Sequence, residues 1–178
     1  MNRFALAALL ALTASPAFAA LKAGDKAPDF TAPGFMAGKA LNFSMADARK
    51  KGPVVLYFFP AADTKGCNLE AKMFADAMDQ YKALGATVIG VTAGNLEKLQ
   101  QISSDTDKCS GKFPVAADPG AKIARQYDSV MPMKPDWSDR TSYVISPAGQ
   151  VIHTYSKLDP SEHVAQTLGA VKAFRATK

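Results

Sequence analysis

Cysteine and histidine are scarce in this sequence: its 178 residues include two of each, Cys67, Cys109, His153 and His163. No CxxC pair and no HxxxH pair is present. Protein zinc sites usually draw their Cys and His ligands from such closely spaced pairs. We therefore expect neither a metal site nor a bound cofactor.

The sequence also lacks a basic run. Its 21 Lys and Arg residues are scattered among 16 Asp and Glu residues, and the formal net charge is +5. Nucleic-acid-binding proteins gather positive charge on one face or one tail, so nucleic acid is not an expected partner. No internal repeat is visible, and the length is typical of one domain.

No apolar run is long enough to span a membrane. The run at residues 4–12 has nine residues, whereas a membrane-spanning helix needs about 20, which argues against an N-terminal membrane anchor. With Arg3 before it and the small-x-small pattern at 17–19 after it, the run is typical of a secretory signal peptide. We expect cleavage near Ala19, one domain over residues 20–178, no stable membrane insertion, and export, most simply to the periplasm.

Strand and helix patterns alternate through the rest of the chain. Five apolar runs predict strands, at residues 54–59, 86–92, 113–118, 142–146 and 150–155. Four amphipathic segments predict helices, which begin at Cys67, Asn95, Asp118 and Asp159. Asn95 and Asp118 are predicted N-caps. Residues 21–53, rich in Gly and Pro, are predicted as a loop-rich lead.

This order predicts the α/β class. Parallel strands joined by helices, followed by an antiparallel hairpin, give a central mixed sheet with helices on both faces. Ligands of such sheets bind at the carboxyl ends of the strands. Cys67 follows the first predicted strand and is therefore expected there.

The position of Cys67 in the opening turn of a helix indicates a reactive thiol. Unpaired backbone N–H groups and the helix dipole favour the thiolate at such a position. Pro60 ends the preceding strand, and Gly66 lets the backbone come close to a ligand beside the sulfur. The alternative is a structural disulfide with Cys109, since exported chains with two cysteines commonly form one.

Pro60, Thr64 and Cys67 form the pattern Pro-x-x-x-Thr-x-x-Cys between a buried strand and a helix. Together with Glu70 and the distant Arg140, this pattern resembles the peroxiredoxins, most of all their bacterioferritin-comigratory, or PrxQ, branch. The likeness covers nearly all of the chain after the predicted signal peptide. It implies a thioredoxin-like fold and a thiol-dependent peroxidase that reduces hydrogen peroxide and small organic hydroperoxides.

The resemblance also implies roles for individual residues. Cys67 is the peroxidatic cysteine, whose thiolate attacks the peroxide and becomes a sulfenic acid. The Thr64 hydroxyl hydrogen-bonds both the thiolate and the peroxide. Gly66 and Arg140 also bind the peroxide, Arg140 stabilises the thiolate, and Pro60 shields the sulfur from water. Each residue also has an ordinary interpretation: Thr64 as a helix cap, Pro60 as the end of a strand, Arg140 as a surface charge.

A second cysteine completes the implied cycle. The branch often carries it five residues after the first, where this chain has Lys72. Cys109, expected at the end of the next helix, fits a second arrangement in the branch, in which it attacks the Cys67 sulfenic acid to give an intramolecular disulfide. The implied partners are a hydroperoxide and a thioredoxin-type dithiol reductant of the cell envelope, and the protein is expected to be a monomer or a weak homodimer.

Glu70, Trp137 and the two histidines have more than one interpretation. Glu70 either orients Arg140 or only complements the helix dipole. Phe59 stands where many relatives have Tyr, and Trp137 either lines the site or anchors a loop. Both histidines are expected to be surface residues or satisfied by hydrogen bonds.

Three other functions compete with peroxide reduction. A thiol–disulfide oxidoreductase of thioredoxin type needs a CxxC pair at the helix start, where this chain has the single cysteine Cys67. A copper-delivery protein needs a CxxxC pair and a His, and Ala71 occupies the position of its second cysteine. A non-enzymatic domain would hold Cys67 and Cys109 in a structural disulfide. Thiol reactivity separates this last function from a peroxidase, because structural disulfides resist reduction.

Overall fold

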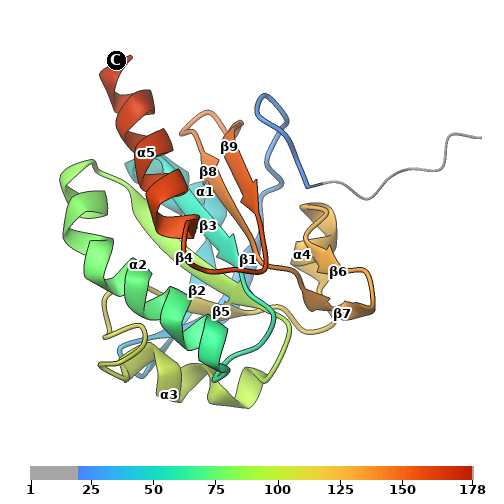
Figure 1. The fold of residues 1–178 in the computed structure, drawn as a ribbon. Coiled ribbons are helices and arrows are strands. Elements are labelled where there is room, and N and C mark those ends of the chain that lie inside the picture. The colour runs from blue at the N-terminus through green and yellow to red at the C-terminus, as the bar shows by residue number, and fades with distance from the viewer. Residues whose placement is uncertain (1–19, 178) are drawn as a thin grey trace, which may run out of the picture.

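A mixed sheet of seven strands organises the chain (Figure 1). The computed structural model describes residues 20–177, so the predicted signal peptide, residues 1–19, lies outside the described residues. The strand order is β2-β1-β5-β4-β3-β8-β9. No helix among the described residues is long and apolar enough to cross a membrane.

The centre of the sheet matches the predicted strands. β3 (Val54–Phe58) pairs in parallel with β4 (Thr87–Thr92), which pairs in parallel with β5 (Val115–Ala117). On the other side β3 pairs antiparallel with β8 (Thr141–Ile145), and β8 pairs with β9 (Val151–Ser156). The mixed sheet and the hairpin are confirmed.

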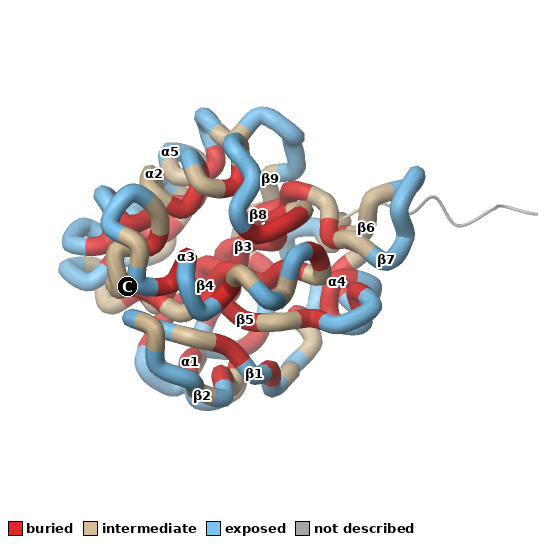
Figure 2. The backbone as a smooth tube through the Cα atoms, turned by 90° about the horizontal axis from the view of Figure 1, so that it is seen from below, coloured by how far each residue is buried: buried red, intermediate tan, exposed pale blue. Residues whose placement is uncertain are grey.

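Helices cover both faces of the sheet, as predicted. Alternate residues of β3 point to opposite faces, so Val55 and Tyr57 lie in one apolar cluster while Val54 and Leu56 lie in another. The first cluster is covered by α2 (Lys65–Ala83), α3 (Leu99–Ser104) and α5 (His163–Ala176). The second is covered by α1 (Met45–Lys51) and α4 (Lys122–Gln126). Figure 2 shows the resulting buried centre at β3, β4 and β8.

The predicted loop-rich lead is wrong for residues 31–51. They form the hairpin of β1 (Thr31–Met36) and β2 (Lys39–Ser44), followed by α1, whose N-cap is Ser44. Pro33 and Gly34 look like loop residues, yet they lie within β1. Gly34 is needed there because a Cβ at this position would lie 2.3 Å from the Val115 carbonyl oxygen of β5.

Two predicted caps also differ. Asn95 has a left-handed backbone, and its amide donates to the Ala62 carbonyl instead of capping a helix. A short 3-10 turn, Leu96–Lys98, precedes α3. Asp118 does cap α4, through bonds from the Ile123 and Ala124 backbone N–H groups, although that helix begins only at Lys122.

Two short strands were not predicted. β6 (Val130–Met131) and β7 (Lys134–Ser138) form a separate hairpin in the segment expected to be a loop. The strand β7 leads directly to Arg140 and β8. The final helix, α5, begins at His163, a few residues after the predicted start at Asp159.

Candidate active site

Cys67 lies in the first turn of α2, as predicted. The helix begins at Lys65, after a loop that leaves the carboxyl end of β3. Thr64 is the N-cap residue. The sulfur is buried, with 4% of the residue exposed, so a charge placed next to it is only weakly screened by water.

Arg140 supplies that charge from the segment between β7 and β8. Its Nη2 donates to the Cys67 Sγ at 3.4 Å, its Nε donates to the Leu158 carbonyl at 2.8 Å, and its Nη1 donates to Glu70 Oε2. Burial opposes the charge of Arg140, but Glu70 and Cys67 raise its pKa. Arg140 is thus a buried cation, and a cation in contact with the sulfur favours the thiolate.

Gly66 makes room for this guanidinium. A Cβ at Gly66 would lie 3.2 Å from Arg140 Nη2, which is tighter than an ordinary van der Waals contact. The sequence predicts that a ligand can come close to the backbone at Gly66. In the structure the group that comes close is the Arg140 side chain, which also contacts Cys67.

Thr64 and Pro60 define the loop before the helix. The Thr64 hydroxyl donates to the Ala61 carbonyl at 3.2 Å, so its oxygen is left as an acceptor. No bond from this hydroxyl to the Cys67 sulfur is found among residues 20–177. The Pro60 carbonyl accepts from the Thr92 hydroxyl at the end of β4. The loop therefore begins at the carboxyl end of β3 and is hydrogen-bonded to the carboxyl end of β4.

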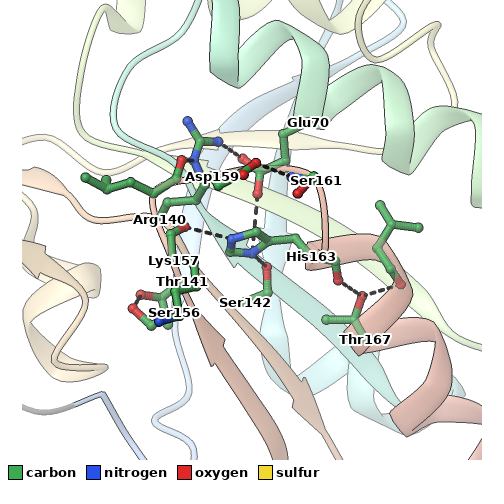
Figure 3. A network of polar contacts seen from close by, with 12 residues as sticks. Glu70, Arg140, Thr141, Ser142, Ser156, Lys157, Asp159, Ser161, His163 and Thr167 are labelled. Carbon is green, nitrogen blue, oxygen red and sulfur yellow. Dashed lines mark hydrogen bonds and ion pairs between the residues drawn. The ribbon is translucent and has the colours of Figure 1, made fainter.

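Glu70 is completely buried and faces Arg140 (Figure 3). Of its two interpretations, the contact with Arg140 is the one that the structure supports. Burial raises the pKa of Glu70 to about 8, although Arg140 acts in the opposite direction. A carboxyl group that is protonated near neutral pH is therefore in direct contact with the cation that touches Cys67.

His163 is a neighbour of the site that sequence reasoning missed. The expectation of a surface residue is wrong, because the first residue of α5 is fully buried, with Nδ1 2.8 Å from Ser142 Oγ and 3.5 Å from Glu70 Oε1. The other expectation, a histidine satisfied by hydrogen bonds, holds. Nothing in the local sequence indicates the contact, since it depends on how α5 packs against α2 and β8.

Cys109 lies in a turn beyond the end of α3, not at the end of the helix as predicted. Both cysteines are free and belong to the same apolar cluster. Burial raises the pKa of the Cys109 thiol to about 12. The two thiols thus have opposite surroundings, because Cys67 touches a cation and Cys109 is surrounded mainly by apolar side chains.

Two lysines hold the Cys109 turn against the segments around Cys67. Lys108 Nζ lies 2.8 Å from Asp63 in the loop before α2 and 3.1 Å from Asp105. Lys112 Nζ donates to the Ala75 carbonyl of α2 at 3.0 Å. The Cys109 turn is therefore joined to α2 and to the loop before it by contacts of lysine side chains as well as by apolar packing.

Trp137 and Phe59 lie outside this set of polar contacts. Trp137 is half-buried on β7, with the Lys134 ammonium 4.2 Å from its ring, which favours the interpretation as an anchor of the hairpin. Phe59 is buried beside Tyr57, with ring centroids 5.5 Å apart. It therefore belongs to the core next to Cys67.

Comparison with known proteins gives consistent matches. The AhpC/TSA family matches residues 23–154. Peroxiredoxin Bcp of Escherichia coli K12 is 30% identical over 148 residues, which cover 80% of this chain and 90% of that protein. The chloroplastic peroxiredoxin Q of rice, Oryza sativa subsp. japonica, is 29% identical over 152 residues, or 85% of this chain and 67% of that one.

Solved structures give the same picture of the fold. Peroxidoxin BcpB of Mycobacterium tuberculosis superposes with a TM-score of 0.75 at 24% identity, over 86% of this chain and 97% of that one. AhpC of the same organism superposes with a TM-score of 0.77 at 16% identity, over 90% of this chain and 96% of that one. The expected thioredoxin-like arrangement is confirmed.

Replacing Arg140 by Lys tests the guanidinium contact. Lys keeps the charge but has a single ammonium, which cannot serve Cys67, Glu70 and the Leu158 carbonyl together. We expect Cys67 in the reduced Arg140→Lys variant to react with iodoacetamide at pH 7 about tenfold more slowly, the factor for a charged hydrogen bond worth roughly 1.5 kcal/mol. Arg175→Lys, an exchange on the exposed end of α5, is the control. Equal alkylation rates in both variants contradict the role of the contact.

Proposed function

This chain belongs to the AhpC/TSA family and is a peroxiredoxin, a thiol peroxidase, and from this premise we propose that Cys67 is its peroxidatic cysteine. The Cys67 thiolate attacks the terminal oxygen of a hydroperoxide, and the O–O bond breaks. The leaving oxygen takes up a proton and departs as water or an alcohol, while the sulfur becomes a sulfenic acid. The contact between Arg140 Nη2 and the sulfur is the observation that carries this proposal.

Arg140 stabilises both ends of this step. Its charge favours the attacking thiolate, and the same donors face the charge that develops on the leaving oxygen. Thr64 serves as an acceptor for the peroxide hydrogen, because its own hydroxyl hydrogen is directed to the Ala61 carbonyl. Gly66 leaves the space in which guanidinium and substrate meet, and Pro60 shields the sulfur.

Cys109 is the proposed resolving cysteine. Its sulfur attacks the Cys67 sulfenic acid, a disulfide forms, and the hydroxyl leaves as water with the proton of the Cys109 thiol. We expect the first turn of α2 to open locally, so that the two Cα atoms come within the roughly 7 Å that a disulfide needs. The family is recycled by thioredoxin-type reductants, and a dithiol protein of the cell envelope is the proposed one here.

Export, cleavage near Ala19 and a monomer or weak homodimer in the periplasm belong to the same proposal. The motif around Arg3 and residues 4–12 supports export, and an intramolecular disulfide needs no second subunit. Expression of the full chain with its leader in a bacterial host should place it in the periplasmic fraction, with an N-terminus near Ala20. N-terminal sequencing that begins at Met1 in the exported protein contradicts the cleavage.

Peroxide kinetics test the two cysteine roles. We expect reduced residues 20–178 to react with hydrogen peroxide near pH 7 orders of magnitude faster than a free thiol, because a positioned cation stabilises the transition state. Cys67→Ser should abolish this reaction, and Cys109→Ser should leave a sulfenic acid that dimedone traps. Intact mass of the wild type should show a monomer with one disulfide.

A rate equal to that of free cysteine overturns the peroxidatic role of Cys67. A disulfide-linked dimer or a stable sulfinate in the wild type overturns the resolving role of Cys109. Fluorescence of Trp137, the single tryptophan, can be recorded continuously during the reaction. Mass spectrometry of quenched samples identifies the sulfenic acid and the disulfide independently.

Lys108→Met tests whether the charged contacts hold the Cys109 turn closed. The substitution removes the pairs with Asp63 and Asp105 but keeps an apolar chain of similar length. We expect disulfide formation after peroxide addition to become roughly two- to fivefold faster, the factor for pairs worth less than about 1 kcal/mol. The preceding sulfenic acid step should not change.

Lys50→Met on α1 is the matched control, because Lys50 also pairs with an aspartate but lies on the opposite side of the sheet. An unchanged or slower disulfide step in Lys108→Met shows that these pairs do not restrain the turn. The measurement is the rate of disulfide formation in rapidly quenched samples, read by intact mass after alkylation.

A further inference from the structure

The second carboxylate oxygen of Glu70 has no conventional hydrogen-bond partner. Glu70 Oε2 accepts from Arg140, whereas Oε1 is buried and unpaired among the described residues. Oε1 faces His163 Nδ1 at 3.5 Å (Figure 3). A buried charged oxygen without a donor is costly, so the protonation of this pair needs an explanation.

The geometry of the ring identifies one of its hydrogens. His163 Nε2 lies 2.9 Å from the Lys157 carbonyl, which can only accept, so Nε2 carries a hydrogen. In a neutral ring the Nδ1 lone pair then accepts from the Ser142 hydroxyl at 2.8 Å and also faces Glu70 Oε1 at 3.5 Å. A carboxylate beside that lone pair would place two acceptors against each other in a buried site.

We propose that Glu70 and His163 hold one additional proton between Oε1 and Nδ1, and that His163 is a positioning residue which acts through Glu70 on Arg140. With this proton the pair is neutral whichever atom carries it. The charge of Arg140 then remains available to the Cys67 thiolate. Without the proton, the Glu70 carboxylate neutralises the guanidinium, and the thiolate loses its counter-charge. The proposal rests on the peroxidatic role of Cys67.

The surroundings of the pair are consistent with this assignment. Besides Arg140, the charged group that acts on His163 is Asp159, in the loop before α5. The Tyr155 ring packs edge-on against the imidazole, with ring centroids 4.8 Å apart. On the other side of Glu70, Tyr57 is fully buried, and burial keeps its pKa well above the usual value. Tyr57 therefore neither supplies nor removes this proton near neutral pH, and the remaining titratable side chain of the site, Cys67, lies across Arg140 from Glu70.

Burial places the proton mainly on the carboxyl side. It raises the pKa of Glu70 to about 8 and lowers the pKa of His163. Below pH 8 the pair keeps its proton, and above it the proton leaves. Peroxide reduction should therefore fall above about pH 8.

Glu70→Gln separates this proton from the contact with Arg140. The amide oxygen of Gln can still accept from Arg140, its NH₂ group faces His163 Nδ1, and it carries no titrating proton. We expect the fall of the peroxide rate constant above pH 8 to disappear in this variant. Its persistence overturns the proposal.

His163→Gln removes the acceptor at Nδ1 but can keep a donor to the Lys157 carbonyl. The protonated carboxyl then loses its hydrogen bond, and a bond worth about 1.4 kcal/mol lowers the pKa of Glu70 by about one unit. We expect the alkaline fall to begin about one pH unit lower, and the rate constant at pH 7 to be about twofold lower. In the double variant Glu70→Gln, His163→Gln, the shift of the pH profile should be absent. His153→Gln, at the other histidine of the chain, should match the wild type, and an equal effect there overturns the assignment.

A measurement without peroxide distinguishes this proposal from the role of Cys67. In ¹⁵N-labelled reduced wild type, the Nδ1 resonance of His163 should titrate near pH 8, and this titration should be absent in Glu70→Gln. If Cys67→Ser retains peroxide activity, the peroxidatic role fails, while the resonance still reports on the shared proton. A resonance that does not change between pH 7 and 9 overturns the shared proton itself.

Discussion

The buried guanidinium of Arg140 is the contact on which the geometry of the site depends. It joins three separate parts of the chain: the first turns of α2 through Cys67 and Glu70, the loop before α5 through the Leu158 carbonyl, and the start of β8, which carries it. A buried cation is costly unless its donors are satisfied. The first turns of α2, the start of β8 and the loop before α5 must therefore be positioned together for Arg140 to make all of these contacts.

The same core gives the two thiols different chemistry. Cys67 lies where the apolar cluster meets the polar contacts of Arg140, and Cys109 lies where the cluster is closed, with no part of it exposed. A thiol becomes a nucleophile by ionising, and apolar surroundings oppose ionisation. The order of events in the proposed cycle, with Cys67 first and Cys109 second, follows from the Arg140 contact at Cys67 and its absence at Cys109 among the described residues, because both thiols are buried.

The sequence predicted the parts of the fold that have strong local signals. The buried runs of β3 and β4, the period of α2 and the Gly-containing turn before β9 each specify an element, and the spacing of Pro60, Thr64 and Cys67 located the site. The hairpin of β1 and β2 was missed because Pro33 and Gly34 look like loop residues, although Gly34 is required for close packing against β5. His163 was missed for another reason: its contact with Glu70 is made by helix packing, which no local pattern encodes.

In the reduced structure the Cys67 sulfur contacts Arg140, and the proposed disulfide replaces that contact by a bond to Cys109. Asn68 and Lys108 both bind the Asp63 carboxylate, so the first turn of the helix and the Cys109 turn are held through one residue. Opening that turn to bring the two sulfurs together moves Cys67 away from Arg140 and disturbs the helix that carries Glu70. In the proposed cycle the conformation that forms the disulfide therefore differs from the one that reacts with peroxide. Because local opening of a helix end needs far less free energy than global unfolding, α2 can alternate between them while the sheet remains intact.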